Sequence, residues 1–399
     1  FIGITGSYEG EGYDRKNLKI PQNQEELLAE IAETVGKDHI AAISFGGAPM
    51  DFSFEKNVGA ILHMYLGGQA VGESVADLIS GEVNPSGKLA ETIPFSEKDT
   101  PAWRYFAPPN DDVEYRESIF VGYRYYETFH VPVKYPFGYG LSYTSFFYSE
   151  LNVPEVYSGG KIQIRFKIKN IGKVSGAEIA QLYICPIESD VIRSHIELKG
   201  FQKIYLHPGE EKEVILELDE RSFSVYDVEK KAFSMLSGKY QICIGASVHD
   251  LQLKANMEVV GNSYFRNERE LFPDYFREQP HGMEISAEQF YQLLGGEPKH
   301  DKEKKRGEYT VYDSYQDVVN VSMFGKFVRG VVHIGLKIIL RGKSERDPAF
   351  KMVKMGVEEG NLEGLIATSG GIATPKLIDM LVYNANKKYL QAFKRLLKK

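Results

Sequence analysis

Cysteine is scarce in this chain of 399 residues, which holds only Cys185 and Cys243. The two lie far apart in the sequence, without Cys-x-x-Cys spacing and without a His-rich neighbour. A zinc site or a disulfide framework is therefore not expected, and the composition is compatible with a reducing compartment. The nine His are scattered singly and none has HExxH or other metal-ligand spacing, so no metal site is predicted.

Excess positive charge and long apolar runs are also missing. The formal net charge is −7 and the pI is about 5.8, which argues against a nucleic-acid-binding protein. The longest apolar stretch, residues 318–340, is interrupted by Lys326, Arg329, His333 and Lys337. A membrane-spanning helix needs about 20 apolar residues with few charges, so no transmembrane segment is predicted.

Motifs for nucleotides and for a serine nucleophile are absent. No GxGxxG opens a helix in residues 1–95, and no GxSxG is present. The chain begins with Phe1 rather than Met, inside a pattern (FIGITG) typical of a buried strand. We therefore expect a fragment, for which the lack of a visible signal peptide is uninformative.

Charge is divided unevenly along the chain. Residues 301–399 hold 19 Lys and Arg against 11 Asp and Glu, whereas residues 1–300 hold 29 against 44. The net charges are therefore +8 and −15. This contrast predicts that the tail is a separate unit with a different role.

Residues 1–95 alternate short apolar runs with helical patterns, which predicts a parallel sheet covered by helices. The expected strands are residues 1–4, 40–45 and 58–64, and the expected helices are residues 24–35 and 71–80. The inward-facing side chains predicted for the two helices are Leu27, Leu28, Ile31 and Val35, then Val71, Val75, Leu78 and Ile79.

The remaining chain divides into four further segments. Residues 96–144 form an irregular aromatic connector, for which packing against neighbouring domains and stacking on sugars are alternative roles. Residues 145–260 show period-two strands at 161–169, 179–184, 213–218 and 240–244, as in an all-β sandwich. Residues 261–309 read as a linker, and residues 310–399 as helices at 312–340, 348–356, 362–368 and 375–397.

The segment with the clearest chemical potential is residues 6–15, GSYEGEGYDR, which directly follows the first strand. Ligands of open parallel sheets bind at the carboxyl ends of strands, where this loop begins. Glycines on both sides of Glu11 remove steric cover from its carboxylate, which suits proton transfer. The alternative is a solvated acidic loop in which Asp14 and Arg15 make local pairs. Glycine-containing turns at residues 46–49 and 67–69 follow the next two predicted strands. They are either tight strand-to-helix turns or rims of the same ligand site.

Ordered motifs over residues 1–260 give the chain a resemblance to glycoside hydrolase family 3, β-glucosidase type. Residues 10–18, GEGYDRKNL, are similar to the acid-bearing loop of the family. Residues 60–77 are similar to a strand and helix of the family's second domain. The family's fibronectin type III-like domain is similar to residues 169–223, through KN-x-G, QLY, LKGF, PGE and DERSF. The other matching strings are NPSGKL (84–89), VGYRYY (121–126) and YPFGYGLSYT (135–144).

The resemblance implies a multidomain α/β plus all-β protein. Its parts would be a partial α/β sandwich (1–95), the aromatic connector (96–144), a fibronectin type III-like domain (145–260), a linker (261–309) and a helical extension (310–399). It also implies a retaining, exo-acting β-glucosidase with two catalytic carboxylates and no metal or organic cofactor. Glu11 matches the acid/base, and Glu9 is the neighbour that could be mistaken for it. The nucleophile Asp would lie on an N-terminal barrel of about 250 residues, which is missing here, so the chain alone is expected to be inactive.

Alternatives for function and partners stay open at this point. A β-xylosidase of the same family and a non-catalytic carbohydrate-binding or scaffold module compete with the glucosidase. The expected partner is a β-glucoside or oligosaccharide, with a homodimer left open, and the expected location is the cytoplasm. The tail resembles extensions of some bacterial members, ending in a segment like residues 365–371. Its basic amphipathic stretch at 321–340 fits a cap docked on protein better than an anionic membrane surface, which is the less expected alternative.

Overall fold

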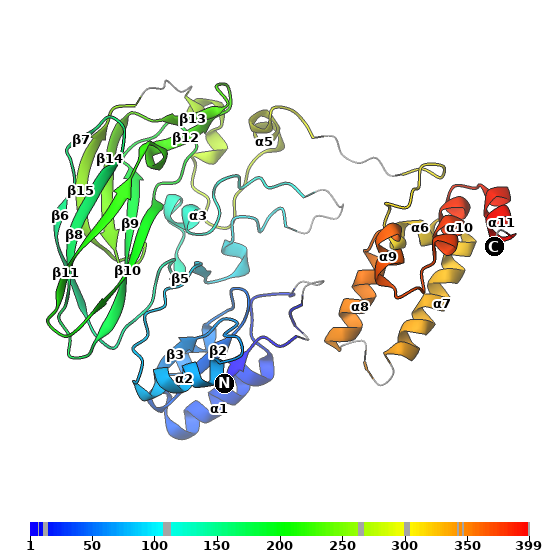
Figure 1. The fold of residues 1–399 in the computed structure, drawn as a ribbon, viewed down its shortest axis with the longest axis horizontal. Helices are drawn as coiled ribbons and strands as arrows, with labels where there is room; N and C mark the ends of the chain where they lie inside the picture. The colour runs from blue at the N-terminus through cyan, green and yellow to red at the C-terminus, as the bar shows by residue number, and fades with distance from the viewer. Residues whose placement is uncertain are drawn as a thin grey trace. The chain divides into compact units, whose positions relative to one another are not determined.

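The computed structural model describes residues 1–6, 8–10, 15–106, 113–261, 267–298, 304–340, 343–344 and 347–397. The chain divides into two compact units, each considered by itself (Figure 1). The first unit comprises Phe1–Ile2 and Leu18–Pro298, and the second comprises Gly3–Asn17 and Lys299–Lys399. The five segments predicted from the sequence divide the chain more finely, and their boundaries stay predictions.

A small α/β layer opens the first unit. Its sheet has the order β1-β2-β3, with β1 at Ile2–Gly3, and the predicted parallel pairing is present between β2 (Ala41–Phe45) and β3 (Ala60–His63). Helices α1 (Gln22–Val35) and α2 (Val71–Ser80) follow β1 and β3 in the chain. Together with the β-sandwich described below, this layer confirms the multidomain α/β plus all-β class.

The apolar stripes of α1 and α2 are covered less completely than their periodicity predicts. On α1, Leu28 is buried, whereas Leu27, Ile31 and Val35 are 55%, 39% and 50% exposed. On α2, Val75 is buried and Ile79 is 58% exposed. The prediction that all of these side chains face inward is therefore wrong, because a sheet of three short strands is too narrow to cover both stripes.

Two antiparallel sheets form the β-sandwich of the first unit (Figure 1). One sheet has the strand order β10-β9-β14-β15-β7 and the other has the order β11-β8-β6. Only the short β7 pairs in parallel, with β15. The strands are β6 (Phe146–Asn152), β7 (Val156–Tyr157), β8 (Ile162–Asn170), β9 (Gly176–Pro186), β10 (Glu197–Leu206), β11 (Glu211–Leu218), β14 (Gly238–Gly245) and β15 (Leu251–Val259).

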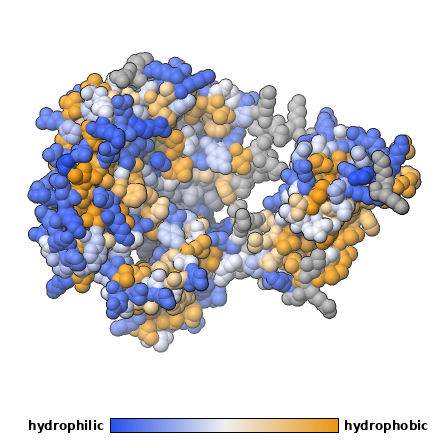
Figure 2. All heavy atoms as spheres, in the orientation of Figure 1, coloured by the Kyte–Doolittle hydropathy of each residue, from blue (hydrophilic) through white to orange (hydrophobic). Residues whose placement is uncertain are grey.

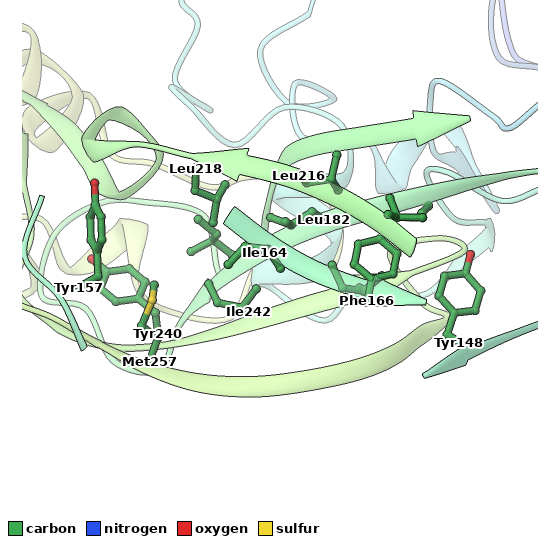
Figure 3. Packing of buried hydrophobic residues seen from close by; sticks show 14 of the residues in the cluster. Tyr148, Tyr157, Ile164, Phe166, Leu182, Leu216, Leu218, Tyr240, Ile242 and Met257 are labelled. Atoms are coloured by element: carbon green, nitrogen blue, oxygen red, sulfur yellow. The ribbon is translucent and has the colours of Figure 1, made fainter. Parts of the chain in front are cut away.

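The inner faces of these sheets share one hydrophobic core, shown in Figure 3. The period-two pattern of β8 explains its contribution, since Ile164, Phe166 and Ile168 point inward while the residues between them are exposed or half-buried. Leu182 from β9 and Ile242 from β14 meet them from the opposite sheet. A short hairpin, β12 (Ser224–Asp227) with β13 (Ala232–Met235), lies between β11 and β14 in the sequence.

The connector supplies a second core of the first unit. Helix α3 (Tyr123–Thr128) buries Tyr125 and Tyr126 against Phe272 and Tyr275. The Tyr125 hydroxyl donates to Gln279 O at 2.6 Å and accepts from the Gly282 amide at 3.0 Å. The other elements of this region are β4 (Ile93–Pro94), β5 (Val133–Tyr135), α4 (Glu268–Leu271) and α5 (Ala287–Leu294).

Helices make up the carboxyl-terminal part of the second unit. They are α6 (Tyr315–Asn320), α7 (Met323–Ile339), α8 (Pro348–Glu358), α9 (Leu362–Thr368), α10 (Pro375–Ala385) and α11 (Tyr389–Leu397). Their shared core contains Val318, Val328, Leu362 and Leu381. Among the described residues, no helix has the length and apolar character needed to cross a bilayer.

Two helices predicted as continuous are each broken in two. The one predicted at 312–340 breaks before Ser322, whose hydroxyl caps α7 by accepting from the Gly325 amide at 2.9 Å. The one predicted at 375–397 breaks after α10, where Lys387 has a φ of +58°. There the Asn386 side chain accepts from the amides of Gly307 and Tyr309 and so fixes the break. Apolar periodicity continues across both breaks, and for that reason it did not reveal them.

Candidate active site

The acid-bearing loop is described in part. The amides of Tyr8 and Glu9 both donate to Thr5 O, at 2.8 and 3.2 Å, so the chain turns directly after β1. Glu9 Oε2 lies 3.2 Å from Arg15 Nε, and the Arg15 side chain is 10% exposed. Glu11, the predicted acid/base, lies outside the described residues, together with its neighbours at 12–14.

The ion pair of Glu9 with Arg15 distinguishes the two candidate carboxylates of this loop. The charge-assisted contact with the guanidinium fixes the orientation of the Glu9 side chain. Glu9 is thereby suited to bracing the loop. The alternative for this loop was that Asp14 and Arg15 make local pairs. Arg15 pairs with Glu9, and Asp14 lies outside the described residues.

A buried polar pair lies at the carboxyl ends of β2 and β3 in the first unit. Ser44 Oγ and His63 Nδ1 are 2.9 Å apart, and Ser44 is fully buried. Burial lowers the pKa of His63, and a hydrogen bond with the Ser44 backbone opposes this shift only in part. The imidazole is therefore neutral near pH 7. Its buried Nε2 has no hydrogen-bond partner among the described residues, so it could meet a polar group or a water.

Aromatic rings surround this pair. The His63 ring lies 4.1 Å from the Tyr65 ring and 5.3 Å from the Phe52 ring, centroid to centroid. Burial and the adjacent Glu91 carboxylate raise the pKa of Tyr65, so its hydroxyl stays protonated. The sequence showed no motif for this cluster; the only indication was that Ser44 and His63 are polar residues ending the apolar runs AAIS and AILH.

A charged cluster lies near Phe52, whose ring centroid is 5.6 Å from that of Tyr135. Glu55 forms an ion pair with Lys134 and accepts a hydrogen bond of 2.7 Å from the Tyr135 hydroxyl. Partial burial would raise the pKa of Glu55, but these two bonds outweigh it and lower the pKa. Glu55 is thus held ionised, unlike a proton donor, and joins the α/β layer to β5.

The two glycine turns after β2 and β3 are shaped by steric needs. A side chain at Gly67 would place its β-carbon 2.9 Å from Val71 Cβ, and Gly68 has a φ of +72°. The Gly46 amide donates to Tyr65 O at 3.2 Å and ties the two loops together. These contacts explain Gly67 and Gly68 as parts of a tight turn before α2.

The NPSGKL string at residues 84–89 joins three parts of the first unit. Asn84 accepts from the Ser142 hydroxyl and the Tyr143 amide, and it donates to Ser175 O. Lys88 donates to Gly140 O at 2.9 Å and pairs with the buried Glu178 at 3.0 Å. The string therefore connects the α/β layer to the connector and to the sandwich through hydrogen bonds and an ion pair.

The connector aromatics divide into two groups. Phe120, Tyr125 and Tyr126 are buried in the core around α3, which favours the packing role for these rings. Trp103, Phe106, Tyr115 and Tyr143 are exposed, and Trp103 lines an open hollow of about 310 Å³ with Lys98, Arg104 and His281. No group of three or more His, Cys, Asp or Glu side chains with metal-site geometry occurs among the residues that the structure describes.

The α/β layer and the β-sandwich both match known protein families. Residues 1–143 match the description "Glycosyl hydrolase family 3 C-terminal domain", and residues 178–248 match "Fibronectin type III-like domain". Residues 1–143 therefore carry the C-terminal domain of glycosyl hydrolase family 3, the family that the sequence motifs indicated. The described residues include these two domains but no (β/α)₈ barrel.

Similar proteins are members of the same family. Thermostable beta-glucosidase B of Acetivibrio thermocellus is 44% identical over 261 residues, which cover 65% of this chain and 34% of that protein. Exo-alpha-(1->6)-L-arabinopyranosidase of Bifidobacterium breve is 36% identical over 262 residues, covering 66% of this chain and 34% of the relative. The chain thus spans about a third of the length of these relatives.

Solved structures agree with this assignment. A family 3 β-glucosidase of Bifidobacterium adolescentis matches with a TM-score of 0.63 and 36% identity, over 66% of this chain and 39% of that chain. The β-glucosidase of Kluyveromyces marxianus in complex with glucose matches with a TM-score of 0.61 and 35% identity, over 65% and 31%. The predicted family is therefore confirmed, and the residue roles stay predictions.

Proposed function

We propose that residues 1–260 are the acid/base-bearing part of a retaining, exo-acting β-glucosidase that removes terminal non-reducing β-D-glucosyl residues. The observation that carries this proposal is the family match over residues 1–143, together with 44% identity to a thermostable β-glucosidase. The nucleophile Asp in this proposal belongs to an N-terminal barrel that the 399 residues do not contain.

Glu11 is the acid/base of the proposed reaction. In the first step its carboxylic acid protonates the glycosidic oxygen while the Asp attacks the anomeric carbon, so the bond to the aglycone breaks and a glycosyl-enzyme forms. In the second step the Glu11 carboxylate takes a proton from water, which displaces the Asp and releases glucose. The two carboxylates would stand about 5–5.5 Å apart, and neither step needs a metal.

The choice of Glu11 over Glu9 rests on two features. Glu11 directly precedes the GYDR string and is flanked by Gly10 and Gly12 in the sequence. Glu9 is engaged with Arg15. In the proposal, Glu9 and Arg15 brace the loop while Glu11 reaches the substrate.

A hybrid enzyme tests this assignment. The barrel-bearing part of thermostable beta-glucosidase B would be joined to residues 1–261 of this chain, in place of the matching third of the relative. We expect the hybrid to hydrolyse cellobiose and aryl β-glucosides. In the hybrid, Glu11→Gln should lower kcat/KM for cellobiose by about 10²–10⁴-fold. The loss should be much smaller for 2,4-dinitrophenyl β-glucoside, because dinitrophenolate departs without protonation.

Glu9→Gln is the matched control, since it removes a carboxylate two residues away. It should leave the ratio of the two kcat/KM values unchanged. The assignment fails if Glu9→Gln, and not Glu11→Gln, selectively suppresses cellobiose hydrolysis. A correctly folded hybrid without any activity would favour a non-catalytic carbohydrate-binding or scaffold module.

A pentosidase is the second candidate function, since one relative is named as an arabinopyranosidase. A β-xylosidase uses the same two carboxylates and differs in the contacts around the sugar's C5 substituent. The gene's complete product should be assayed with nitrophenyl glucoside, xyloside and α-L-arabinopyranoside. The glucosidase proposal predicts the highest kcat/KM for the glucoside, and a preference for either pentoside would overturn it.

A cytoplasmic location belongs to the same proposal. Cys185 and Cys243 are both buried free thiols whose sulfurs lie 3.8 Å apart on neighbouring strands. Thiols this close would be at risk of oxidation outside a reducing compartment. Cell fractionation with an antibody to the chain tests the location, and recovery from the culture medium would contradict it.

A further inference from the structure

Helix α7 exposes an unbroken apolar stripe along its length. Met323, Phe327, Val331, Ile334 and Ile338 recur every three or four residues and so share one face. Their exposed fractions are 90%, 68%, 53%, 61% and 66%. Single exposed apolar residues are ordinary, whereas five aligned on one helix form a patch that marks an interaction site.

The adjacent side of α7 packs against the core of its own unit. Val328 is buried in the helical core, and Phe324 and Val332 pack against that core. The exposed stripe therefore lies on a different side of the helix from the side that holds the unit together. Figure 2 shows hydrophobic residues gathered over the region of α7.

The polar border of α7 consists of Lys, Arg and His side chains. The helix contains Lys326, Arg329, His333 and Lys337, all exposed, and no Asp or Glu. At about 100° per residue, these four side chains lie together along one border of the apolar stripe. An apolar stripe bordered by cations alone is the pattern of a helix that lies in a lipid–water interface.

Helix α11 repeats this chemistry. Leu390, Phe393 and Leu397 are 78%, 58% and 68% exposed, and the only charged residues of the helix are Lys394 and Arg395. The sequence of residues 301–399 has a net charge of +8. Exposed apolar side chains therefore occur beside cations on both α7 and α11, although Arg395 of α11 pairs with Asp379.

We propose that the exposed stripe of α7 binds the surface of an anionic phospholipid bilayer, with Phe327 and Ile334 among the acyl chains and the basic border among the headgroups. Charge complementarity selects this occupant. A second copy presenting the same face would bring two sets of cations together, whereas anionic lipids neutralise them. With 17 residues and three Lys or Arg, α7 would lie on the bilayer and not span it. The inference is independent of the proposed glucosidase.

Vesicle flotation of the full 399-residue chain tests the proposal. Vesicles of pure phosphatidylcholine would be compared with vesicles containing 30% phosphatidylglycerol (about one lipid in three), at low and high NaCl. We expect binding to the anionic vesicles only, with loss at high salt because the Debye length falls to about 3 Å at 1 M. Lys326→Ala with Lys337→Ala should weaken binding by about 25-fold.

Apolar variants and matched controls distinguish binding through the stripe from non-specific adsorption to vesicles. Phe327→Ser with Ile334→Ser should weaken binding at least about 30-fold, because two large side chains no longer leave water. Phe201→Ser is the matched control, since Phe201 of the sandwich is 66% exposed. Lys203→Ala with Lys239→Ala is the control for charge. Neither control should change binding, and circular dichroism should be unchanged throughout.

Three outcomes would overturn the proposal. The first is no binding to anionic vesicles, and the second is equal binding to both kinds of vesicle. The third is a dimer in analytical ultracentrifugation that dissociates with Phe327→Ser and Ile334→Ser, because the stripe would then be covered by a second copy of the chain.

Discussion

Asn170 shows how one residue can hold several turns of the sandwich in place. Its side chain is fully buried and makes four hydrogen bonds. The amide donates to Val174 O and Leu206 O, and the carbonyl accepts from Thr144 Oγ1 and the Gly172 amide. Removing the Asn170 side chain would leave its buried partners without hydrogen bonds. The loss of folding free energy should therefore exceed that of an exposed side chain.

Asn170→Ala should therefore lower the free energy of unfolding by about 3 kcal/mol. Asn256→Ala is the control, because Asn256 is exposed and accepts one side-chain bond from Gln241. The control should change stability by less than about 0.5 kcal/mol. Urea unfolding of both variants measures the difference, and equal destabilisation would contradict the account.

His63 is a second single residue with a predicted effect, here on how folding stability depends on pH. Burial lowers its pKa in the folded chain, so the folded state binds a proton less readily than the unfolded state. Stability is then present above the unfolded pKa of about 6.5 and is lost as the pH falls below it. The protein should unfold at lower urea at pH 5 than at pH 7.5.

His63→Gln should reduce this dependence on pH, whatever its effect on stability at pH 7.5. His39→Gln removes an exposed histidine of the same domain and should leave the dependence as it was. If His63→Gln and the wild type lose stability in parallel between pH 7.5 and pH 5, His63 is not the group that titrates.

At the scale of elements, the junction of α6 and α7 depends on a close approach at Gly325. A β-carbon there would lie 2.6 Å from Val319 Cα. Gly330, in the same helix, has open space around its missing side chain. The two glycines therefore respond in opposite ways to the same substitution.

Gly325→Ala should destabilise the helical unit, since α7 must shift away from α6. Gly330→Ala should stabilise it by about 0.5–1 kcal/mol, because alanine is the better helix former. Thermal unfolding monitored by circular dichroism compares the two variants. The same sign for both would contradict the described packing.

The sequence predicted elements best where one physical signal dominated. The period-two pattern of residues 161–169 predicted β8, and apolar runs predicted β2 and β3. The break at Ser322 depends on a local cap to the Gly325 amide, and the break at Asn386 on bonds to the distant amides of Gly307 and Tyr309. Apolar periodicity contains neither of these. For the candidate site, glycine flanks singled out Glu11, whereas the Ser44–His63 pair forms only when two strands lie side by side.

At the scale of the whole molecule, the chain spans about a third of the relatives it matches. The proposed chemistry needs two carboxylates on different domains. The chain alone, purified, should therefore not hydrolyse nitrophenyl β-glucoside above the background rate. Hydrolysis at a normal enzymatic rate that is abolished by Glu11→Gln would contradict this expectation, because the 399 residues would then include a nucleophile.

The central claim is that Glu11 is the acid/base of a retaining glucosidase, and azide rescue of the hybrid enzyme tests it most directly. In Glu11→Ala the glycosyl-enzyme forms from dinitrophenyl glucoside but lacks a base to activate water. Azide needs no base, so added azide should raise the rate. It should also yield the β-glucosyl azide, since it attacks the face opposite the Asp. An α-glucosyl azide would mark Glu11 as the nucleophile instead, and a rate unaffected by azide would show that it is not the acid/base.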